Sequence, residues 1–140
     1  MPLNSTLKAL LDYLQDSINR IERMDLTIDM ILGDEDIQDL IDRRMQKTVE
    51  TCIDIATHLI AALKLPRRET AGDAFELLGR EKIISPKLAK KMAGASGLRN
   101  VIVHGYRDMD YRLAYTDLDD KLNDLRQFAK EVWKFLEKQN

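Results

Sequence analysis

Cysteine, proline, glycine and aromatic residues are all scarce in this chain of 140 residues. Its one cysteine, Cys52, cannot form an internal disulfide, so a disulfide-stapled fold is excluded, and we expect Cys52 to be a core residue. Three Pro and six Gly exclude a collagen-like or low-complexity chain. The sequence also lacks a leader-like N-terminus and any run of about 18 apolar residues, so we expect neither export nor a membrane span, and place the protein in the cytoplasm.

An excess of positive charge is also missing. The chain has 22 Lys and Arg against 24 Asp and Glu, which argues against a general nucleic-acid binder. The charges are nevertheless uneven, because residues 1–42 hold ten acids and three bases, whereas residues 82–107 hold no acid at all. This acid-free segment either attracts phosphate or forms the solvated face of a helix, and charge alone favours the second.

The hydrophobic residues follow the period of helices, and no segment alternates as a strand does. Steps of three and four predict a helix over residues 4–24 and a second one of about 28 residues, ended by Pro66. Residues 25–36 break the pattern. A short helix capped by Thr70 and stopped by Gly79 should follow, then one that starts at Ser85-Pro86 and ends at Gly105. The last helix begins near residue 116 and turns Trp133 towards the core or a dimer interface.

We therefore predict an all-α fold: one domain over residues 1–140, built as an antiparallel bundle of four main helices plus a short one. Extra apolar width on the long second helix favours a partner surface, which predicts a homodimer. The residues that broaden this face are Val49, Ile53, Ala56 and Ile60.

Side chains suited to catalysis or anion binding cluster in "GLRNVIVHGYRDMDY", residues 97–111, which contains Arg99, His104 and Tyr106. Five residues turn an ideal helix by about 500°, so Arg99 and His104 lie about 140° apart around its axis. Either the helix loosens at Gly105 or a second subunit completes the site. Asn100 shares the helix face of His104 and is expected to orient the imidazole.

An imidazole that moves protons and a guanidinium that stabilises phosphoryl charge suffice to cleave RNA without a metal. In that reaction the ribose 2′-OH attacks the adjacent phosphate, so DNA is not a substrate. By themselves, such residues near a helix end are more often capping and packing residues. Two alternatives therefore stay open: a non-catalytic helical dimer that binds nucleotide, RNA or a partner protein, and a purely structural bundle.

Residues 99–106 resemble the R-x4-H-x-Y motif of the HEPN superfamily, and more closely the HepT-like toxins of HEPN/MNT toxin-antitoxin pairs. The resemblance extends over residues 54–106, and the helix order fits the whole chain. It implies a dimeric ribonuclease toxin of a type VII-like system that cleaves tRNA or mRNA with Arg99 and His104. It also implies that the MNT nucleotidyltransferase antitoxin neutralises the toxin by AMPylation of Tyr106, which adds bulk and negative charge beside the pair. ATP and Mg²⁺ would serve only the antitoxin, and the toxin would need no cofactor.

Other polar residues are weaker candidates. Gln46, Glu50, Asp54 and His58 form a line at steps of four, which either supports the site or is a solvated stripe. Glu50 and Asp54 are the better candidates, and the absence of paired Glu-x-x-His motifs argues against a di-iron site. Tyr111 and Tyr115 either stack on bases or pack against the last helix. Guidance of RNA, with solubility as the alternative, is assigned to Lys90, Lys91, Arg107 and Arg112.

Overall fold

The computed structural model describes residues 5–105 and 109–139, and all regular structure in these residues is helical. The all-α prediction is confirmed. The order is α1 (Ser5–Arg23), α2 (Ile28–Gly33), α3 (Glu35–Ala62), α4 (Ala71–Arg80), α5 (Pro86–Val103), α6 (Tyr111–Tyr115) and α7 (Leu118–Lys138).

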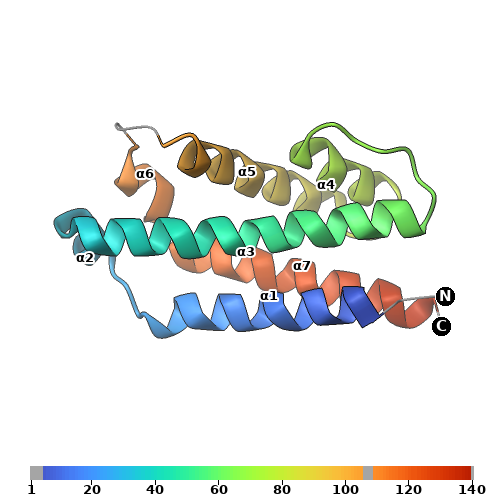
Figure 1. Cartoon of the computed structure of the whole chain (residues 1–140), viewed down its shortest axis with the longest axis horizontal. Helices are drawn as coiled ribbons and strands as arrows, with labels where there is room; N and C mark the ends of the chain where they lie inside the picture. The colour runs from blue at the N-terminus through green and yellow to red at the C-terminus, as the bar shows by residue number, and fades with distance from the viewer. Residues whose placement is uncertain (1–4, 106–108, 140) are drawn as a thin grey trace.

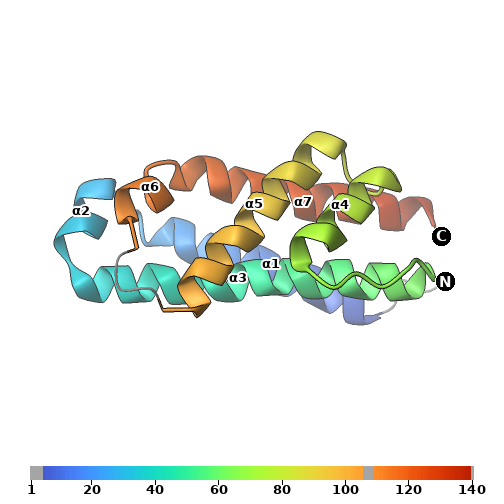
Figure 2. The same cartoon turned by 90° about the horizontal axis from the view of Figure 1, so that it is seen from above.

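Helix α3 is the axis of the fold. In Figure 1 it runs through the middle of the molecule, with α1 on one side, α4 and α5 on the other, and α7 behind. The short helices α2 and α6 lie at the end of the bundle opposite the termini. Seen from above, α5 crosses the bundle obliquely, so that its C-terminal end lies over α3 (Figure 2). The end of α5 that carries the motif is therefore placed against the long helix.

The core forms where the predicted apolar stripes meet, and the single chain covers most of the α3 stripe. Val49 and Ala56 are fully buried and Ile60 nearly so, because α3 packs against α1, α4, α5 and α7, whereas Ile53 is only partly buried. Most of the width of this stripe is therefore used within one chain, and the homodimer stays a prediction. Of the two places predicted for Trp133, the core is wrong: the residue is 42% exposed, since α7 turns Val132 and Leu136 inward instead.

Side-chain caps define where the helices begin. The hydroxyl of Thr70 accepts a hydrogen bond from the Asp73 backbone N–H at 3.1 Å, and that of Ser85 accepts one from Leu88 at the same distance. Each cap typically contributes about 1 kcal/mol. A cap that the sequence pattern did not reveal is Thr27, which accepts from the Met30 N–H and starts α2 inside the segment expected to be irregular. Local capping thus outweighs the interrupted apolar pattern there.

Gly79 does not stop α4 as predicted, because the helix continues to Arg80. A Cβ at position 79 would lie 2.7 Å from the Cβ of Ala89 on α5, a separation that real Cβ atoms do not reach. The glycine is therefore required by the close approach of α4 and α5, which the sequence alone does not distinguish from a helix stop.

A single carboxylate fastens α6 to α3. Both oxygens of Asp42 accept hydrogen bonds, one from the Tyr111 hydroxyl at 2.5 Å and one from the Tyr115 hydroxyl at 2.6 Å. The two rings stack with centroids 6.0 Å apart, and Tyr115 is only 2% exposed. Of the two roles considered for these tyrosines, the structure supports packing. Burial first, and the bond to Asp42 second, raise the pKa of both tyrosines above the usual range.

Gly79→Ala is expected to destabilise the protein by about 1–3 kcal/mol, because the new methyl group overlaps a rigid neighbouring helix. This cost exceeds the gain in helix propensity of about 1 kcal/mol. Gly94→Ala is the matched control, since a Cβ there meets nothing within 4 Å, and it should be neutral or stabilising. Urea denaturation of the three proteins checks this, and a Gly79→Ala protein as stable as the parent would contradict the close approach.

Tyr115→Phe is expected to lower the free energy of unfolding by about 1.5–3 kcal/mol, because it removes the hydrogen bond that the buried Tyr115 hydroxyl donates to the Asp42 carboxylate. The parent should also lose stability as the pH rises above about 10, the ordinary pKa of tyrosine. There the unfolded chain ionises while the folded tyrosines keep their protons, so the unfolded state binds fewer protons and gains relative stability.

Denaturation curves at pH values from about 8 to about 11, on either side of the ordinary tyrosine pKa, measure both effects. The loss with pH should be smaller in Tyr115→Phe than in the parent. Tyr13→Phe, which removes a hydroxyl from a side chain that is 46% exposed, is the control and should change stability by less than about 0.5 kcal/mol. Identical pH profiles for the parent and Tyr115→Phe would rule out the Asp42 contact.

Candidate active site at the end of α5

The motif lies where α5 ends. The helix stops at Val103, His104 is its C-cap, and Gly105 follows with φ of +64°, a left-handed conformation that favours glycine. The backbone N–H of Gly105 donates to the Ile102 carbonyl at 3.1 Å, which closes the last turn. The left-handed turn comes only after His104, whose own N–H still donates to the Asn100 carbonyl at 3.0 Å as in a regular helix, so the turn at Gly105 does not by itself bring Arg99 and His104 to one face. Tyr106 and Arg107, predicted as the modified and an RNA-guiding residue, lie outside the described residues.

Arg99 faces α3 and is largely sheltered. Its Nη1 atom lies 3.9 Å from Oε2 of Glu50, and its side chain is 23% exposed. The same oxygen of Glu50 accepts a hydrogen bond from Gln46 Nε2 at 3.3 Å. Because a charge-assisted hydrogen bond is typically about 2.7–2.9 Å long, the contact of Arg99 with Glu50 is a loose one.

The Arg99 guanidinium keeps donor capacity for a further anion. Its Nε–H is shielded from solvent and meets no hydrogen-bond acceptor among residues 5–105 and 109–139. A buried donor without a partner costs about 1–3 kcal/mol, so a phosphoryl oxygen that reaches this N–H recovers that cost. Glu50, predicted as a supporting residue, is thus brought to Arg99 and limits where the cation can move.

The other predicted supporting residues are less engaged. Asp54 and His58 are exposed, and within the described part of the chain neither makes an ion pair. The polar line on α3 therefore divides into Gln46 and Glu50 near Arg99 and a solvated pair further along. Asn100 is exposed and is linked to His104 through the backbone, because the His104 N–H donates to the Asn100 carbonyl at 3.0 Å.

Helix α5 is anchored mainly by its first half. All of its buried residues lie at or before Ser96, whereas Leu98, Arg99 and Ile102 are partly exposed and Val103 is 46% exposed. The motif is therefore carried by two helical turns that the rest of the chain covers incompletely.

A hollow of about 350 Å³ opens beside this end of α5, between α3 and α6. The start of the motif loop at Gly105 forms one wall, and Tyr111 forms another. The α3 wall brings carboxylates and a cation together, and the full lining is Asp39, Asp42, Arg43, Gln46, Val101, Ile102, Gly105, Met109 and Tyr111. Since both oxygens of Asp42 are engaged by the tyrosines, Asp39 and Arg43 are the charged groups left to meet a ligand there, and Arg43 is the cation.

The predicted basic residues do not gather at the motif. Lys90 and Lys91 precede His104 on the same helix by more than three turns, which places them about 20 Å away along the axis. The ammonium of Lys91 is 3.4 Å from an oxygen of Asp124 on α7, and Lys90 is exposed on the surface. The acid-free segment thus does not form a patch around His104. Arg112 is nearer, because it lies on α6 next to Tyr111 of the hollow, and it is exposed.

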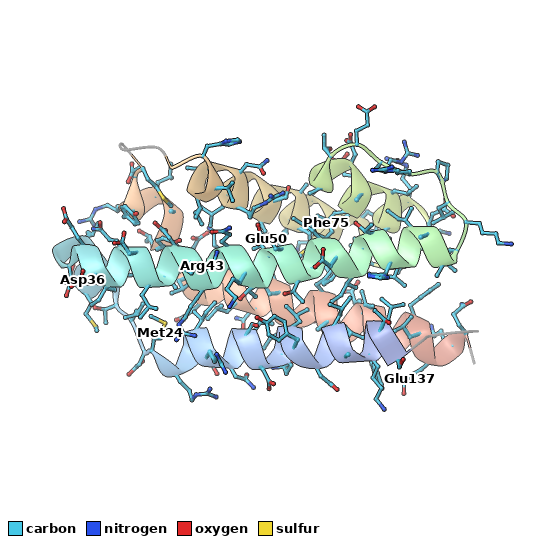
Figure 3. All side chains as sticks on the ribbon, viewed as in Figure 1. Met24, Asp36, Arg43, Glu50, Phe75 and Glu137 are labelled. Carbon is cyan, nitrogen blue, oxygen red and sulfur yellow. The ribbon has the colours of Figure 1, made fainter. Side chains whose placement is uncertain are left out.

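Sequence reasoning missed the cations of α3. Figure 3 labels Arg43 on this helix, beside Glu50 in the same view. Counting charge along the chain hides Arg43 and Arg44, because Asp39 and Asp42 precede them and cancel the sum. The helical phase was the available signal, since Arg43 and Lys47 are four residues apart and share a face.

Cys52 is fully buried, and desolvation raises the pKa of its thiol far above the usual range, as expected of a core residue. Over residues 5–105 and 109–139, no three side chains of His, Cys, Asp or Glu converge in a way suited to a metal ion. None of the helices described is both long and apolar enough to span a bilayer.

Comparison with known proteins places the chain in a family. The family model described as ribonuclease HepT-like matches residues 14–132. A tRNA nuclease HepT of Aphanizomenon flos-aquae is 31% identical over 111 residues, which are 79% of this chain and 76% of that protein. An mRNA nuclease HepT of Shewanella oneidensis is 28% identical over 128 residues, 86% of this chain and 96% of that one.

A solved structure has the same fold. The tri-AMPylated HEPN toxin of Shewanella oneidensis, in complex with its MNT antitoxin, matches with a TM-score of 0.86 and 25% identity, over 94% of this chain and 99% of that chain. Sequence and fold therefore agree over nearly the whole length, and the resemblance of the motif is confirmed at the level of the family. The chain belongs to the HepT-like ribonucleases.

Proposed function

We propose that this protein is the toxin of a HEPN/MNT toxin-antitoxin pair and acts as a metal-independent endoribonuclease, with Arg99 and His104 as its catalytic residues. The observation that carries the proposal is the sheltered guanidinium of Arg99, whose Nε–H lacks an acceptor in the described chain, five residues before a histidine at the exposed end of α5. Relatives named as a tRNA nuclease and an mRNA nuclease support RNA as the substrate class.

The chemistry needs one proton carrier and one cation. The imidazole of His104 takes the proton of a ribose 2′-OH as the 2′-oxygen attacks the adjacent phosphorus. The bond from phosphorus to the 5′-oxygen breaks, and the imidazolium returns the proton to that leaving oxygen. Arg99 binds the non-bridging oxygens on which charge accumulates, while Glu50 restrains its position. The products are a 2′,3′-cyclic phosphate and a 5′-hydroxyl, and no step requires a metal ion.

Control of the toxin is assigned to the motif tyrosine. An MNT antitoxin would transfer AMP from ATP, with Mg²⁺, to the hydroxyl of Tyr106, as the AMPylated relative in complex with its antitoxin suggests. The adduct would attach a phosphate two residues after His104 in the sequence, where it would compete with RNA for Arg99. We further propose a cytoplasmic homodimer, in which partly covered apolar residues at the end of α5, such as Val103, meet a second copy.

His104→Ala and Arg99→Ala are each expected to reduce RNA cleavage by about 10²- to 10⁴-fold, the usual loss of a general acid-base or an electrostatic stabiliser. The assay incubates purified protein with total tRNA and a long single-stranded RNA in excess EDTA, followed by gel and end-group analysis. Lys138→Ala is the control, because it removes an exposed cation from the last residue of α7 and should leave the rate within a factor of about two.

Cleavage that ends with EDTA would refute the metal-free chemistry. Undiminished cleavage by His104→Ala would refute the assignment of that residue. RNA binding without new ends, by a protein whose intact mass shows an unmodified Tyr106, would favour a binding module over a nuclease.

Tyr106→Phe is expected to keep ribonuclease activity and to resist neutralisation, because the ring lacks the hydroxyl that accepts AMP. Parent and variant are incubated with the cognate antitoxin, ATP and Mg²⁺, then assayed for RNA cleavage and weighed by intact-mass spectrometry. The parent should gain mass in steps of one AMP and lose activity, while the variant does neither. Thr57→Ala, which removes an exposed hydroxyl group from α3, is the control and should behave as the parent. AMP attached to the Tyr106→Phe protein would show that another residue is modified.

A further inference from the structure

A second hollow lies on the other side of α3 from the motif, in the groove between α1 and α3. It measures about 300 Å³, and four of its lining residues are cations: Arg20 from α1, and Arg43, Arg44 and Lys47 from α3. Asp16 is the one acidic residue in the lining. We call this the basic groove. In a chain of net charge −2, a local balance of four positive charges against one negative charge is unusual and indicates an anionic ligand.

The cations of the basic groove are not neutralised by the chain itself. Within residues 5–105 and 109–139, none of the four makes an ion pair, and the Nε–H of Arg44 is buried without an acceptor. Unpaired cations are common on the rest of the described surface, and the distinctive feature of the basic groove is that four of them line one hollow. Since close like charges repel, a groove that keeps four unpaired cations is better explained by a bound polyanion than by folding.

The hollow of about 350 Å³ at the end of α5, whose lining includes Gly105 but neither Arg99 nor His104, is called the motif hollow, and it shares a wall with the basic groove. Arg43 lines both, because it lies on the part of α3 that is exposed between α5 and α1 (Figure 3). Lys47 follows Arg43 by one helical turn, with about 5–6 Å between the Cβ atoms of such a pair. Cations therefore continue from the edge of the motif hollow across α3 and into the groove with α1.

The groove also offers surface for bases. Tyr13 is 46% exposed and Leu40 is 44% exposed, and both line it. Aromatic rings beside cations are the combination with which proteins hold single-stranded nucleic acid, since every base can stack and every nucleotide carries a phosphate.

We propose that the basic groove binds the sugar-phosphate backbone of the RNA substrate, on the single strand that leaves the cleavage site past Arg43. This inference rests on the proposed function. Such contacts recognise charge and not sequence, so the groove contributes affinity and register. The nucleotide bases of the RNA that lie at the motif determine where the strand is cut.

Salt dependence of binding separates this role from a general effect of charge. The measurement is fluorescence anisotropy of a labelled single-stranded RNA of about 20 nucleotides, longer than one single-strand binding site. It is titrated at several salt concentrations with protein that carries His104→Ala to prevent cleavage. Each phosphate contact on a single strand contributes about 0.7 to the slope of log K against log salt. Arg20→Gln with Lys47→Gln should therefore lower the slope by about 1.4 and weaken binding roughly tenfold at low salt.

The matched control removes the same charge elsewhere. Lys87→Gln with Lys134→Gln takes two exposed cations from α5 and α7 and should leave the slope unchanged. Arg20→Lys with Lys47→Arg keeps the groove charge and should restore the parent slope. If the double Gln variant does not fold, Lys47→Gln alone should lower the slope by about 0.7.

Three results would overturn the inference. The first is a salt slope in the Arg20→Gln, Lys47→Gln variant that equals the slope of the parent. The second is a control variant whose slope falls as much as that of the groove variant. The third is a parent that is dimeric while the groove variant is monomeric, because the groove would then be a protein interface. Failure of the proposed function is tested separately, by cleavage of an RNA of about three nucleotides with protein that keeps His104. Such an RNA is too short to fill a single-strand binding groove, so its cleavage tests the chemistry without requiring the groove.

Discussion

Burial of one continuous face of α3 is the constraint on which the rest of the structure depends. The 28 residues of this helix are covered on one side by α1, α4, α5 and α7, and this leaves the opposite side of α3 in solvent. The charged residues of α3 are confined to that strip, so Glu50 meets Arg99 along one edge and Lys47 meets α1 along the other. The position of each functional charge follows from the register of the apolar residues behind it.

Much of the helical framework was predictable because several helix boundaries have a local cause. Thr70 and Ser85 cap helices through their own hydroxyls, and Pro66 lies just past the end of the long helix, so these boundaries need no tertiary information. Gly79 and Trp133 were misread because their roles depend on neighbours. A glycine that ends a helix and one that admits a second helix have the same sequence context, and the facing Ala89 decides between them.

The site was only partly predictable for a similar reason. Arg99 and His104 stand out because a motif records them, and the contact with Glu50 follows from a polar line at helical spacing. The basic segment at residues 82–107 was a misleading guide, because the lysines of α5 lie near its start, about 20 Å along the axis from His104. Arg43 and Arg44 were overlooked because the acids that precede them in sequence cancel their charge in a linear count, although both cations line one groove. Charge has to be summed over a surface, and a linear count cannot do that.

The incomplete burial of the last two turns of α5 has a consequence for how the site responds to ligands. Helical turns with no fully buried residue typically open at a small fraction of the free energy of global unfolding, so the Arg99 end of α5 is expected to open before its first half. Any molecule that bridges Arg99 to α3 binds only the closed form and shifts this local equilibrium towards it. The residues proposed as catalytic thus lie on the segment whose order a ligand can most easily change, and slowed amide exchange over residues 97–103 would report that the site is occupied.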